Sequence, residues 1–490
     1  MNIKIPFREK IIQIADQLGI NIYLVGGSLR NLLLNVPIND WDFAVTSKVF
    51  EFSRKLADET NSHFVLLDKD FGIARVVPRS REFYMDFALT RGDIDNDLIS
   101  RDFTINSLAL NLKEDKLIDP AGGMGDLDKK IVRTLSRKCI IDDPLRILRA
   151  YRMKAKFRFE IEESTRKWIL EEKEKIKSIA FERIRDEIFK IFTSHKSTGI
   201  IRQIYNDGIL GILIPELIPL DGLKQSGFHK YDALQHSFHT LEEVEKLEDE
   251  DYSSLEKVII QNKSEDVIAR NNDSVLPLKD LLKDYFSEIS VHERYRMQVF
   301  KFATLLHDIG KIEKEKIVSR GHIYYPNHHT CGRDIWNKIA NRFKLSNKEK
   351  TFGAKVVEYH LAPIFISKEK EKRAGDLRKY KLFERTRESA PAVILISWAD
   401  VEAGRGESLT NQMIERHHDL CISLMKSYFV GDPIAKPPQF LDGKDVMEIL
   451  RLKSGKKIGN ILSALNQASA LGDVVDYDQA CSFVKFYYKL

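Results

Sequence analysis

The 490-residue sequence predicts an α+β protein, in which a small head with a mixed sheet is followed by a mostly α-helical chain. Two observations lead to this prediction. Residues 21–120 alternate short apolar runs, which are typical of strands, with helical stretches. From about residue 141 onward, apolar residues recur at spacings of three and four, which is the period of an amphipathic helix.

The elements follow one another in a clear order. An amphipathic helix is expected over residues 1–20, and the strands are expected at IYLV, WDFAV, HFVLL, IARVV, EFYMDFAL and SLALNL. The turn DPAGG (119–123) ends this region. We therefore predict four parts: a head over residues 1–140, neck and body helices over 141–222, a helical domain over 223–428 and a helical tail over 429–490.

Composition narrows the class of protein. Hydrophobic residues make up 43% of the chain and charged residues 31%, as in ordinary globular proteins. We expect a cytoplasmic protein with no membrane partner and reduced thiols, because no apolar run approaches a membrane span, the N-terminus lacks a signal-peptide core and the four cysteines form no CxxC pair. The net charge of +5 is mild, but basic residues gather in residues 129–158, which favours a polyanionic partner.

The most informative segment is LVGGSLRNLLLNVPINDWDFAV (24–45). In a strand, Asp40 and Asp42 project to the same face and Trp41 to the other. Two carboxylates that close repel each other unless a cation lies between them. The preceding Gly-Gly-Ser offers backbone N–H groups where a helix begins, which suits a phosphate. The combination predicts nucleotidyl transfer with divalent metal ions.

Five blocks occur in the order found in the class II tRNA nucleotidyltransferase and poly(A) polymerase family, which includes CCA-adding enzymes. These blocks, over roughly residues 20–220, are GGSLRNLLL with DWD, RDFTINSLAL (101–110), DPAGGMGDL (119–127), DDPLRILRAYR (142–152) and FERIRDEIFKIF (181–192). The sequence resembles that family, although Arg30-Asn31 stands where the family usually has Arg-Asp. The resemblance implies a tRNA partner, CTP and ATP as substrates, and Mg²⁺ in the head.

The resemblance also implies roles for particular residues. Asp40 and Asp42 would hold Mg²⁺, and Asp86 is a candidate third catalytic carboxylate. The implied nucleotide-binding residues are Gly26, Gly27, Ser28, Arg30, Arg101, Asp102, Asn106, Asp143, Arg146, Arg149 and Arg152.

Asp143 and Arg146 are the implied base-selecting pair. They are expected on one face of a helix, because they are three residues apart. Asp accepts hydrogen bonds and Arg donates them, so together they match the edges of cytosine and adenine. An ordinary helix salt bridge is the alternative interpretation.

A second set of residues predicts a metal site in the helical domain. His307-Asp308 lies in the apolar segment FATLLHDIGK, which we expect to be a helix ending near Gly310. With His236, His328, His360 and Asp400 it resembles the HD-domain phosphohydrolases, whose dispersed ligands hold one or two metal ions. Imidazole with carboxylate suits Mn²⁺, Fe²⁺, Co²⁺, Ni²⁺ or Zn²⁺, and Mg²⁺ is the alternative ion.

Several alternatives stay open. His239 and His329 are alternatives to His236 and His328, whereas His229 and the other histidines are expected to be surface or core residues. In the tail, Lys456 and Lys457 are expected to bind RNA phosphates. The function could be addition of CCA, of CC only or of A only, poly(A) synthesis, or phosphoester hydrolysis by an HD domain with an RNA-binding head. The sequence does not predict an oligomeric state.

Overall fold

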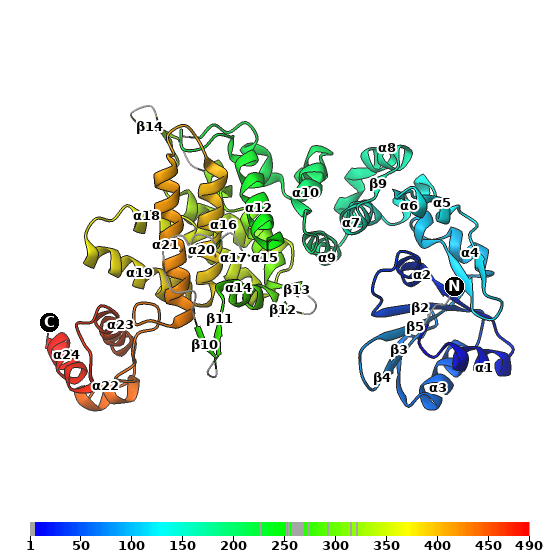
Figure 1. Cartoon of the computed structure of the whole chain (residues 1–490), viewed down its shortest axis with the longest axis horizontal. Helices are drawn as coiled ribbons and strands as arrows, with labels where there is room; N and C mark the ends of the chain where they lie inside the picture. Colours follow the sequence, from blue (N-terminus) through cyan, green and yellow to red (C-terminus); the bar gives the residue numbers. More distant parts are fainter. Residues whose placement is uncertain are drawn as a thin grey trace. The chain divides into compact units, whose positions relative to one another are not determined.

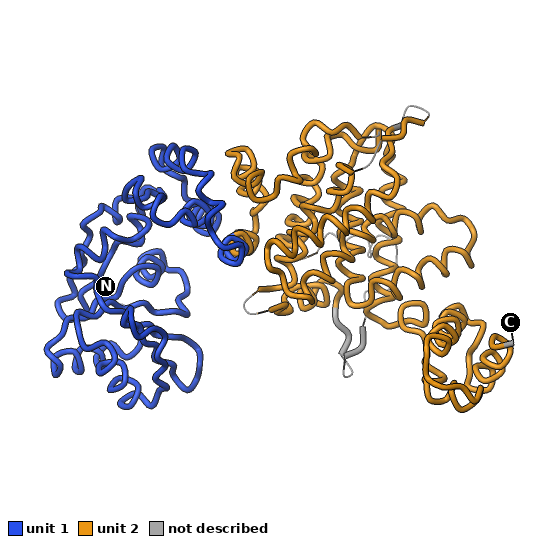
Figure 2. The backbone as a smooth tube through the Cα atoms, turned by 180° about the vertical axis from the view of Figure 1, so that it is seen from behind, with its two compact units in different colours: residues 1–187 blue, residues 188–490 orange. Residues whose placement is uncertain are grey.

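The computed structural model describes residues 5–225, 227–250, 252, 255, 269–271, 274–291, 294–313, 316–319 and 322–489. The chain divides into two compact units, residues 1–187 and residues 188–490 (Figure 2). The division falls inside the region 141–222 that was predicted as neck and body. It lies within one helix, α9 (Phe181–Phe192).

Unit 1 is built on a seven-stranded sheet with the strand order β3-β4-β5-β2-β1-β6-β7. These strands are β1 (Ile22–Val25), β2 (Asp40–Val45), β3 (Ser62–Asp68), β4 (Ile73–Pro78), β5 (Tyr84–Leu89), β6 (Ala109–Asn111) and β7 (Lys116–Ile118). β2 and β5 run parallel, while the other neighbouring strands are antiparallel, so the predicted mixed sheet is confirmed. β4, which was expected from the apolar run IARVV, alternates half-buried and buried residues with the period of two of a strand.

Helices surround this sheet and continue beyond it. They are α1 (Arg8–Leu18), α2 (Gly26–Leu33), α3 (Val49–Glu59), α4 (Ile94–Ile99), α5 (Gly123–Asp128), α6 (Arg137–Asp142), α7 (Arg146–Phe157) and α8 (Glu163–Glu172). The short strands β8 (Ile131–Val132) and β9 (Glu160–Ile161) pair in parallel beside them. α1 ends at Gly19, whose φ of 67° is the left-handed conformation that commonly closes a helix.

The prediction that Asp143 and Arg146 share a helix is wrong. Asp143 follows the end of α6 with extended backbone angles, φ −139° and ψ 92°, and α7 begins only at Arg146. The cause is Pro144, because a proline disfavours the helical conformation of the residue before it. The two side chains therefore stand on either side of a turn, which is closed by the Arg146 N–H donating to the Asp143 carbonyl at 3.0 Å.

Unit 2 is mostly helical in its described part (Figure 1). Its helices are α10 (Ser197–Asn206), α11 (Ile209–Leu213), α12 (Ala233–Asp249), α14 (Leu278–Ser287), α15 (Arg296–Leu305), α16 (His328–Arg342), α17 (Asn347–Tyr359), α18 (Ala362–Ser367), α19 (Lys372–Thr386), α20 (Ala390–Gly404) and α21 (Asn411–Val430). α12 packs against α20 and α15, and α16 packs against α17. α20 is buried along nearly its whole length, as its apolar sequence APAVILISWA requires.

Three two-stranded ribbons join these helices. They are β10 (Ala269–Asn271) with β11 (Ser274–Leu276), β12 (Ile289–Val291) with β13 (Arg294–Tyr295), and β14 (Ile317–Ser319) with β15 (His322–Tyr324).

The last three helices have an apolar core of their own. α22 (Gly443–Leu450), α23 (Lys456–Ala470) and α24 (Tyr477–Lys489) bury a cluster that includes Val446, Ile461, Leu465 and Val484. Across the described residues, no helix has the combination of length and apolar character that crossing a bilayer requires.

Candidate active site and candidate metal centre

The first candidate site lies where β1 passes directly into α2. Gly26 opens the helix with a φ of +64°, and a Cβ at this position would lie 2.7 Å from Arg101 Nη1. Glycine is therefore needed at position 26 for two reasons: the left-handed backbone and the close approach of the Arg101 guanidinium. Gly27 and Ser28 follow in the first turn of α2, whose N–H groups have no partner within the helix.

Asp40 and Asp42 begin β2, beside that helix terminus. Trp41 is buried, Asp40 is exposed and Asp42 is half-buried, so these three residues alternate as predicted. Ser28 joins the two elements: Asp42 N donates to Ser28 Oγ at 2.7 Å, and Ser28 Oγ lies 3.0 Å from Asp42 Oδ2. The structure therefore places the two carboxylates next to the phosphate cradle that the sequence suggested.

Asp86 is the register partner of Asp42 on the parallel strand β5. Both of its carboxylate oxygens accept from Arg75, at 2.7 and 2.8 Å. Burial raises the pKa of Asp42, the hydrogen bond from Ser28 opposes the rise, and the nearby charges of Asp86 and Asp40 add to it. A cation at Asp40 and Asp42 would relieve this repulsion, which is the physical reason to expect one.

Four of the predicted nucleotide-binding residues form one polar chain beneath the site. Arg30 Nη1 donates to Asn106 Oδ1, and Asn106 Nδ2 donates to Asp102 Oδ1 at 2.8 Å. Asp102 Oδ2 then lies 2.7 Å from Arg149 Nη2. Burial, followed by the charge of Arg152, lowers the pKa of Arg30 to about 10.

The other predicted nucleotide-binding residues have separate partners. Arg101 Nη2 pairs with Asp97 at 2.8 Å. Arg152 Nε pairs with Glu187 at 2.9 Å. Asp143 Oδ2 lies 3.0 Å from Arg183 Nη2, whereas Arg146 Nη1 donates to the Cys139 carbonyl at 3.2 Å. Each of the two side chains therefore has another partner, and the alternative interpretation, a salt bridge between Asp143 and Arg146, is wrong.

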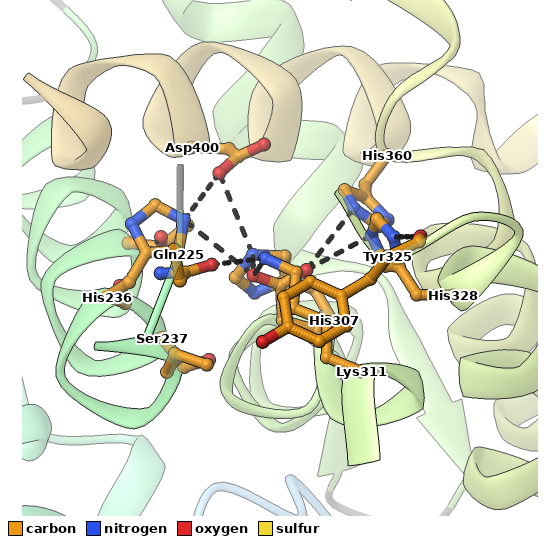
Figure 3. A network of polar contacts seen from close by, with 12 residues as sticks. Gln225, His236, Ser237, His307, Lys311, Tyr325, His328, His360 and Asp400 are labelled. Carbon is orange, nitrogen blue, oxygen red and sulfur yellow. Dashed lines mark hydrogen bonds and ion pairs between the residues drawn. The ribbon is translucent and has the colours of Figure 1, made fainter. Parts of the chain in front are cut away.

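The second candidate site lies among α12, α16, α17, α20 and the turn after α15. His236, His307, Asp308, His328, His360 and Asp400 are all buried there. They supply overlapping groups of three whose ligand atoms lie within 4.8 Å of one another: His236 with His307 and Asp308, His307 with His360 and Asp400, and Asp308 with His328 and His360. Figure 3 shows the imidazoles of His236, His307, His328 and His360 and the carboxylate of Asp400 gathered around one centre.

Local structure explains how the histidine–aspartate pair enters the centre. The expected helix ends earlier than predicted, at Leu305, so His307 and Asp308 lie in the turn that follows. A Cβ on Gly310 would lie 1.9 Å from the His328 carbonyl oxygen. The glycine therefore lets this turn pack on the start of α16, where His328 is the first residue.

Three imidazoles are held in one orientation by the same kind of contact. The Nδ1 atoms of His307, His328 and His360 lie 2.7–2.8 Å from the carbonyl oxygen three residues earlier. An Nδ1–H donated to a carbonyl leaves the lone pair on Nε2, which is how metal-binding histidines are commonly oriented. The three Nε2 atoms are buried and make no hydrogen bond within the described part of the chain.

The carboxylates face those nitrogens across gaps that fit a cation. Asp308 Oδ1 lies 3.2 Å from His328 Nε2 and 3.8 Å from His360 Nε2, and Asp400 Oδ1 lies 3.7 Å from His307 Nε2. Two acceptors face each other in each pair, so a metal ion between them satisfies both. The donor set therefore fits a divalent ion with nitrogen and oxygen ligands.

Lys311 adds a fixed positive charge beside the centre. Its Nζ lies 2.5 Å from Asp308 Oδ2 and also donates to Gln225 Oε1. Burial raises the pKa of Asp308, but Lys311 and His307 outweigh it and hold the pKa well below the usual range. Asp308 is therefore the carboxylate anion, which is the form that binds a metal.

The structure also places three histidines that were not among the six expected ligands. His239 faces Glu242 at 2.7 Å and stacks on Tyr231, outside the groups of ligands. His329 is likewise outside them, beside His328. His229, which was expected to be a surface or core residue, has a ring nitrogen within 4.8 Å of a ring nitrogen of His236 and a carboxylate oxygen of Asp400. No local pattern marks His229, since the contact depends on a segment far away in the sequence.

A pocket of about 420 Å³ opens onto this centre. Asp308, His328 and Asp400 lie in its wall, and most of the remaining lining is apolar, including Phe365 and Met413. Pockets of this volume hold small organic ligands.

In the tail, Lys456 and Lys457 are exposed at the start of α23. The Lys457 ammonium lies 4.3 Å from the centre of the Tyr488 ring. Gly455 and Gly459, beside them, have no atom within 4 Å of a would-be Cβ.

Comparison with known proteins covers the same regions. Residues 22–133 match the poly A polymerase head domain, and residues 158–220 match a domain described as the probable RNA and SrmB-binding site of polymerase A. The A-adding tRNA nucleotidyltransferase of Deinococcus radiodurans is 28% identical over 468 residues, which is 94% of each chain. The CC-adding tRNA nucleotidyltransferase of Synechocystis sp. is 38% identical over 190 residues, which is 38% of this chain and 45% of that relative.

Solved structures agree on the fold. The Thermotoga maritima CCA-adding enzyme complexed with tRNA aligns with a TM-score of 0.60, covering 99% of this chain and 97% of that one, at 20% identity. The matched head and RNA-binding domains, the ordered motifs around Asp40 and Asp42, and the shared fold all point the same way. The chain belongs to the class II tRNA nucleotidyltransferase and poly(A) polymerase family.

Proposed function

We propose that this chain is a tRNA nucleotidyltransferase, which uses CTP and ATP to add CCA, or part of it, to the 3′ end of tRNA. The observation that carries the proposal is the placement of Asp40 and Asp42 beside the glycine-opened terminus of α2. The relatives support this proposal, because those compared above are named as A-adding, CC-adding and CCA-adding enzymes.

Each part of the head has a task in this reaction. Asp40 and Asp42 would hold Mg²⁺, which supplies electrostatic stabilisation of the triphosphate and activation of the primer hydroxyl. The N–H groups at the start of α2 would bind phosphate oxygens. Arg30, Asn106, Asp102 and Arg149 would keep this surface rigid from below, since each of them is held by the next.

Base selection remains with Asp143 and Arg146 in this proposal. Arg146 is held by a carbonyl and Asp143 by Arg183, so a nucleotide base would have to compete with these contacts. We assign nucleotidyl transfer to residues 1–140, base selection and RNA binding to 141–222, the metal centre to 223–428 and tRNA anchoring, with Lys456 and Lys457, to 429–490.

The test is extension of three synthetic tRNAs, which end before CC, after C and after CC, with CTP, ATP, UTP and GTP singly and together. Ordered addition that stops after CCA, and that disappears in Asp42→Asn, supports a complete enzyme. Addition of C only, or of A only after CC, assigns the chain to a split system. Untemplated A tails on any RNA support poly(A) synthesis. Nucleotide addition that continues unchanged in Asp42→Asn contradicts the proposal.

For the second centre we propose metal-dependent hydrolysis of a phosphoester, by residues resembling an HD domain. His236, His307, Asp308, His328, His360 and Asp400 would hold a divalent ion, which supplies Lewis-acid activation of the phosphoryl group. Lys311 would bind a phosphate oxygen, and the apolar pocket wall would hold the organic part of the substrate. A phosphate at an RNA 3′ end is the substrate class that fits a tRNA end-maker, because its removal exposes the hydroxyl to be extended.

This second activity is tested with 2′,3′-cyclic and 3′-phosphorylated dinucleotides in the presence of Mn²⁺, Co²⁺, Ni²⁺ or Mg²⁺. We expect turnover in the parent and its loss in His307→Ala, while His239→Ala, a histidine on α12 outside the ligand groups, keeps it. Equal turnover in the parent and His307→Ala would contradict the proposal.

A further inference from the structure

His229 lies in the segment that precedes α12, beside the histidine–aspartate centre. Its ring meets that of His236 with 4.4 Å between centroids and an angle of 71° between planes. One ring nitrogen of His229 lies within 4.8 Å of the ligand atoms of His236 and Asp400. These three residues form a group that shares no member with the group of Asp308, His328 and His360 at the other end of the centre.

The backbone around His229 is fixed to the segment that follows Asp400. Lys230 N donates to the Gly404 carbonyl at 2.9 Å, and Gly406 N donates to the Phe228 carbonyl at 3.0 Å. His229 and Arg405 form a β-bridge between these bonds. The imidazole is therefore held by the same stretch of chain that ends the helix of Asp400.

Two glycines make this close approach possible. A Cβ on Gly406 would lie 2.3 Å from the Gly227 carbonyl oxygen and 2.7 Å from His229 N, and a Cβ on Gly404 would lie 3.1 Å from the Phe228 carbonyl oxygen. Any side chain at position 406 would push the His229 segment away. The sequence therefore builds a rigid position for this imidazole, which is how ligands of metal sites are held.

The imidazole also has unused hydrogen-bonding capacity. Its Nδ1 is buried and has no hydrogen-bond partner among the residues that the structure describes. His229 lines the pocket that opens onto the centre, together with Asp308 and Asp400. Buried polar atoms are nearly always satisfied in folded proteins, so a ligand beside His229 is the simplest explanation of an imidazole held in this way.

We propose that His229 is a further metal ligand, which binds a divalent transition-metal ion together with His236 and Asp400. The proposal rests on the metal centre put forward under the proposed function and adds to it a ligand outside the six recognised in the sequence. With His229, the end of the centre formed by His236 and Asp400 is a nitrogen-rich position, which favours ions such as Co²⁺, Ni²⁺ or Zn²⁺ over Mg²⁺.

The experiment uses the full chain with Asp40→Asn and Asp42→Asn, so that the head carboxylates do not contribute to metal binding. This parent is stripped with a chelator and titrated with Co²⁺, with visible absorption and bound cobalt as the readouts. His229→Phe keeps an aromatic ring of similar size and removes both ring nitrogens. His239→Phe makes the same change on α12 outside the ligand groups, and His236→Phe removes a ligand of the centre itself.

We expect Co²⁺ affinity to fall about tenfold or more in His229→Phe, with a changed absorption spectrum, and to stay unchanged in His239→Phe. Parent-like affinity and spectrum in His229→Phe, together with loss in His236→Phe, would overturn the role of His229 and leave the metal centre standing. Absence of bound cobalt in the parent would overturn the centre and His229 with it.

A second variant separates ligation from packing. In His229→Ala the ring is absent, and added imidazole can enter the space that it leaves. We expect imidazole to restore the parent absorption spectrum with Co²⁺. If imidazole has no effect while metal-free His229→Ala unfolds at the parent temperature, His229 is not a ligand.

Discussion

At the scale of single residues, buried charged side chains in the head are stabilised by a series of linked hydrogen bonds and ion pairs. Asp102 is the centre of that chain, with one oxygen accepting from Asn106 and the other beside Arg149. Its side chain is 6% exposed and that of Arg149 is 33% exposed. A carboxylate this deeply buried is stable only while its charged partner stays in place.

Asp102→Asn should therefore weaken both the fold and the nucleotidyl transfer. The shape is kept, but Arg149 loses its counter-charge, so we expect the free energy of unfolding to fall by about 1–3 kcal/mol. Urea denaturation measures this. Asp115→Asn is the matched control, because Asp115 is 59% exposed in its pair with Arg8 and should contribute about 0.5 kcal/mol or less. Equal losses in the two variants would contradict the argument.

Residues also show where prediction from the sequence stopped. His307, Asp308, His328 and His360 could be found because several histidines and aspartates stood in an apolar context with no other explanation. His229 could not be found in this way. Its place in the centre depends on backbone hydrogen bonds to a segment after α20, and such pairing leaves no periodic signal in the sequence.

At the scale of elements, helix pairs in unit 2 depend on positions without a side chain. Gly353 lies inside α17, where a Cβ would be 1.9 Å from Trp336 Cζ2 on α16. Trp336 is fully buried, so its ring cannot move aside without opening the core.

Gly353→Ala should for this reason destabilise the chain, although alanine favours a helix. We expect a net loss of about 1–3 kcal/mol in the free energy of unfolding of unit 2. Gly199→Ala makes the same substitution on α10, where Gly199 is exposed and nothing lies within 4 Å of a would-be Cβ. This control should gain up to about 1 kcal/mol. Chemical denaturation of both variants decides; a gain at position 353 would refute the packing argument.

The start of α17 carries a pH-dependent contact. Ser346 and Glu349 form a capping box, and Arg294 Nε donates to the Glu349 carboxylate at 2.7 Å. Burial raises the pKa of Glu349, but the hydrogen bonds from Arg294 and Ser346 outweigh it and leave the pKa below its ordinary value of 4.5. A carboxyl whose pKa is lower in the folded state stabilises the fold above its unfolded pKa and loses that effect as the pH falls.

Glu349→Gln should cost about 3 kcal/mol at pH 7, because Arg294 is left buried without this counter-charge. The difference in the free energy of unfolding between the parent and the variant should shrink as the pH falls from 5 through 4.5 toward 3.5, since the parent carboxyl then takes up a proton. Urea titrations across this range measure it. A difference that stays constant with pH would show that Glu349 is not held as a carboxylate.

Elements were predictable where their period was local. The strands of the head could be found because each is a short apolar run, as in β4, and α1 because its apolar face recurs at helical spacing. The break between α6 and α7 was missed, although Pro144 marks it, because the apolar spacing continues across the turn. The end of α15 at Leu305 was missed because apolar residues continue past it, at Leu306 and Ile309.

At the scale of the whole molecule, the two candidate sites lie in different compact units. Asp40 and Asp42 belong to unit 1, and all the candidate ligands of the histidine–aspartate centre belong to unit 2. The polar contacts described for each centre stay within its own unit. The chemistry of each site is therefore complete on one side of the division, and the sites should be separable by mutation.

If the sites are separable, a variant of each site should lose one of the two proposed activities and keep the other. Asp42→Asn should abolish nucleotide addition, by a factor of about 10³ or more, because the pair of carboxylates for Mg²⁺ is broken. It should leave hydrolysis of a cyclic-phosphate dinucleotide unchanged. His307→Ala should do the reverse, while addition of CTP and ATP to a tRNA that already ends in a hydroxyl continues at the parent rate. If His307→Ala slowed that addition as well, the two units would be coupled, and a tRNA carrying a terminal phosphate would then show whether the coupling acts through the substrate or through the protein.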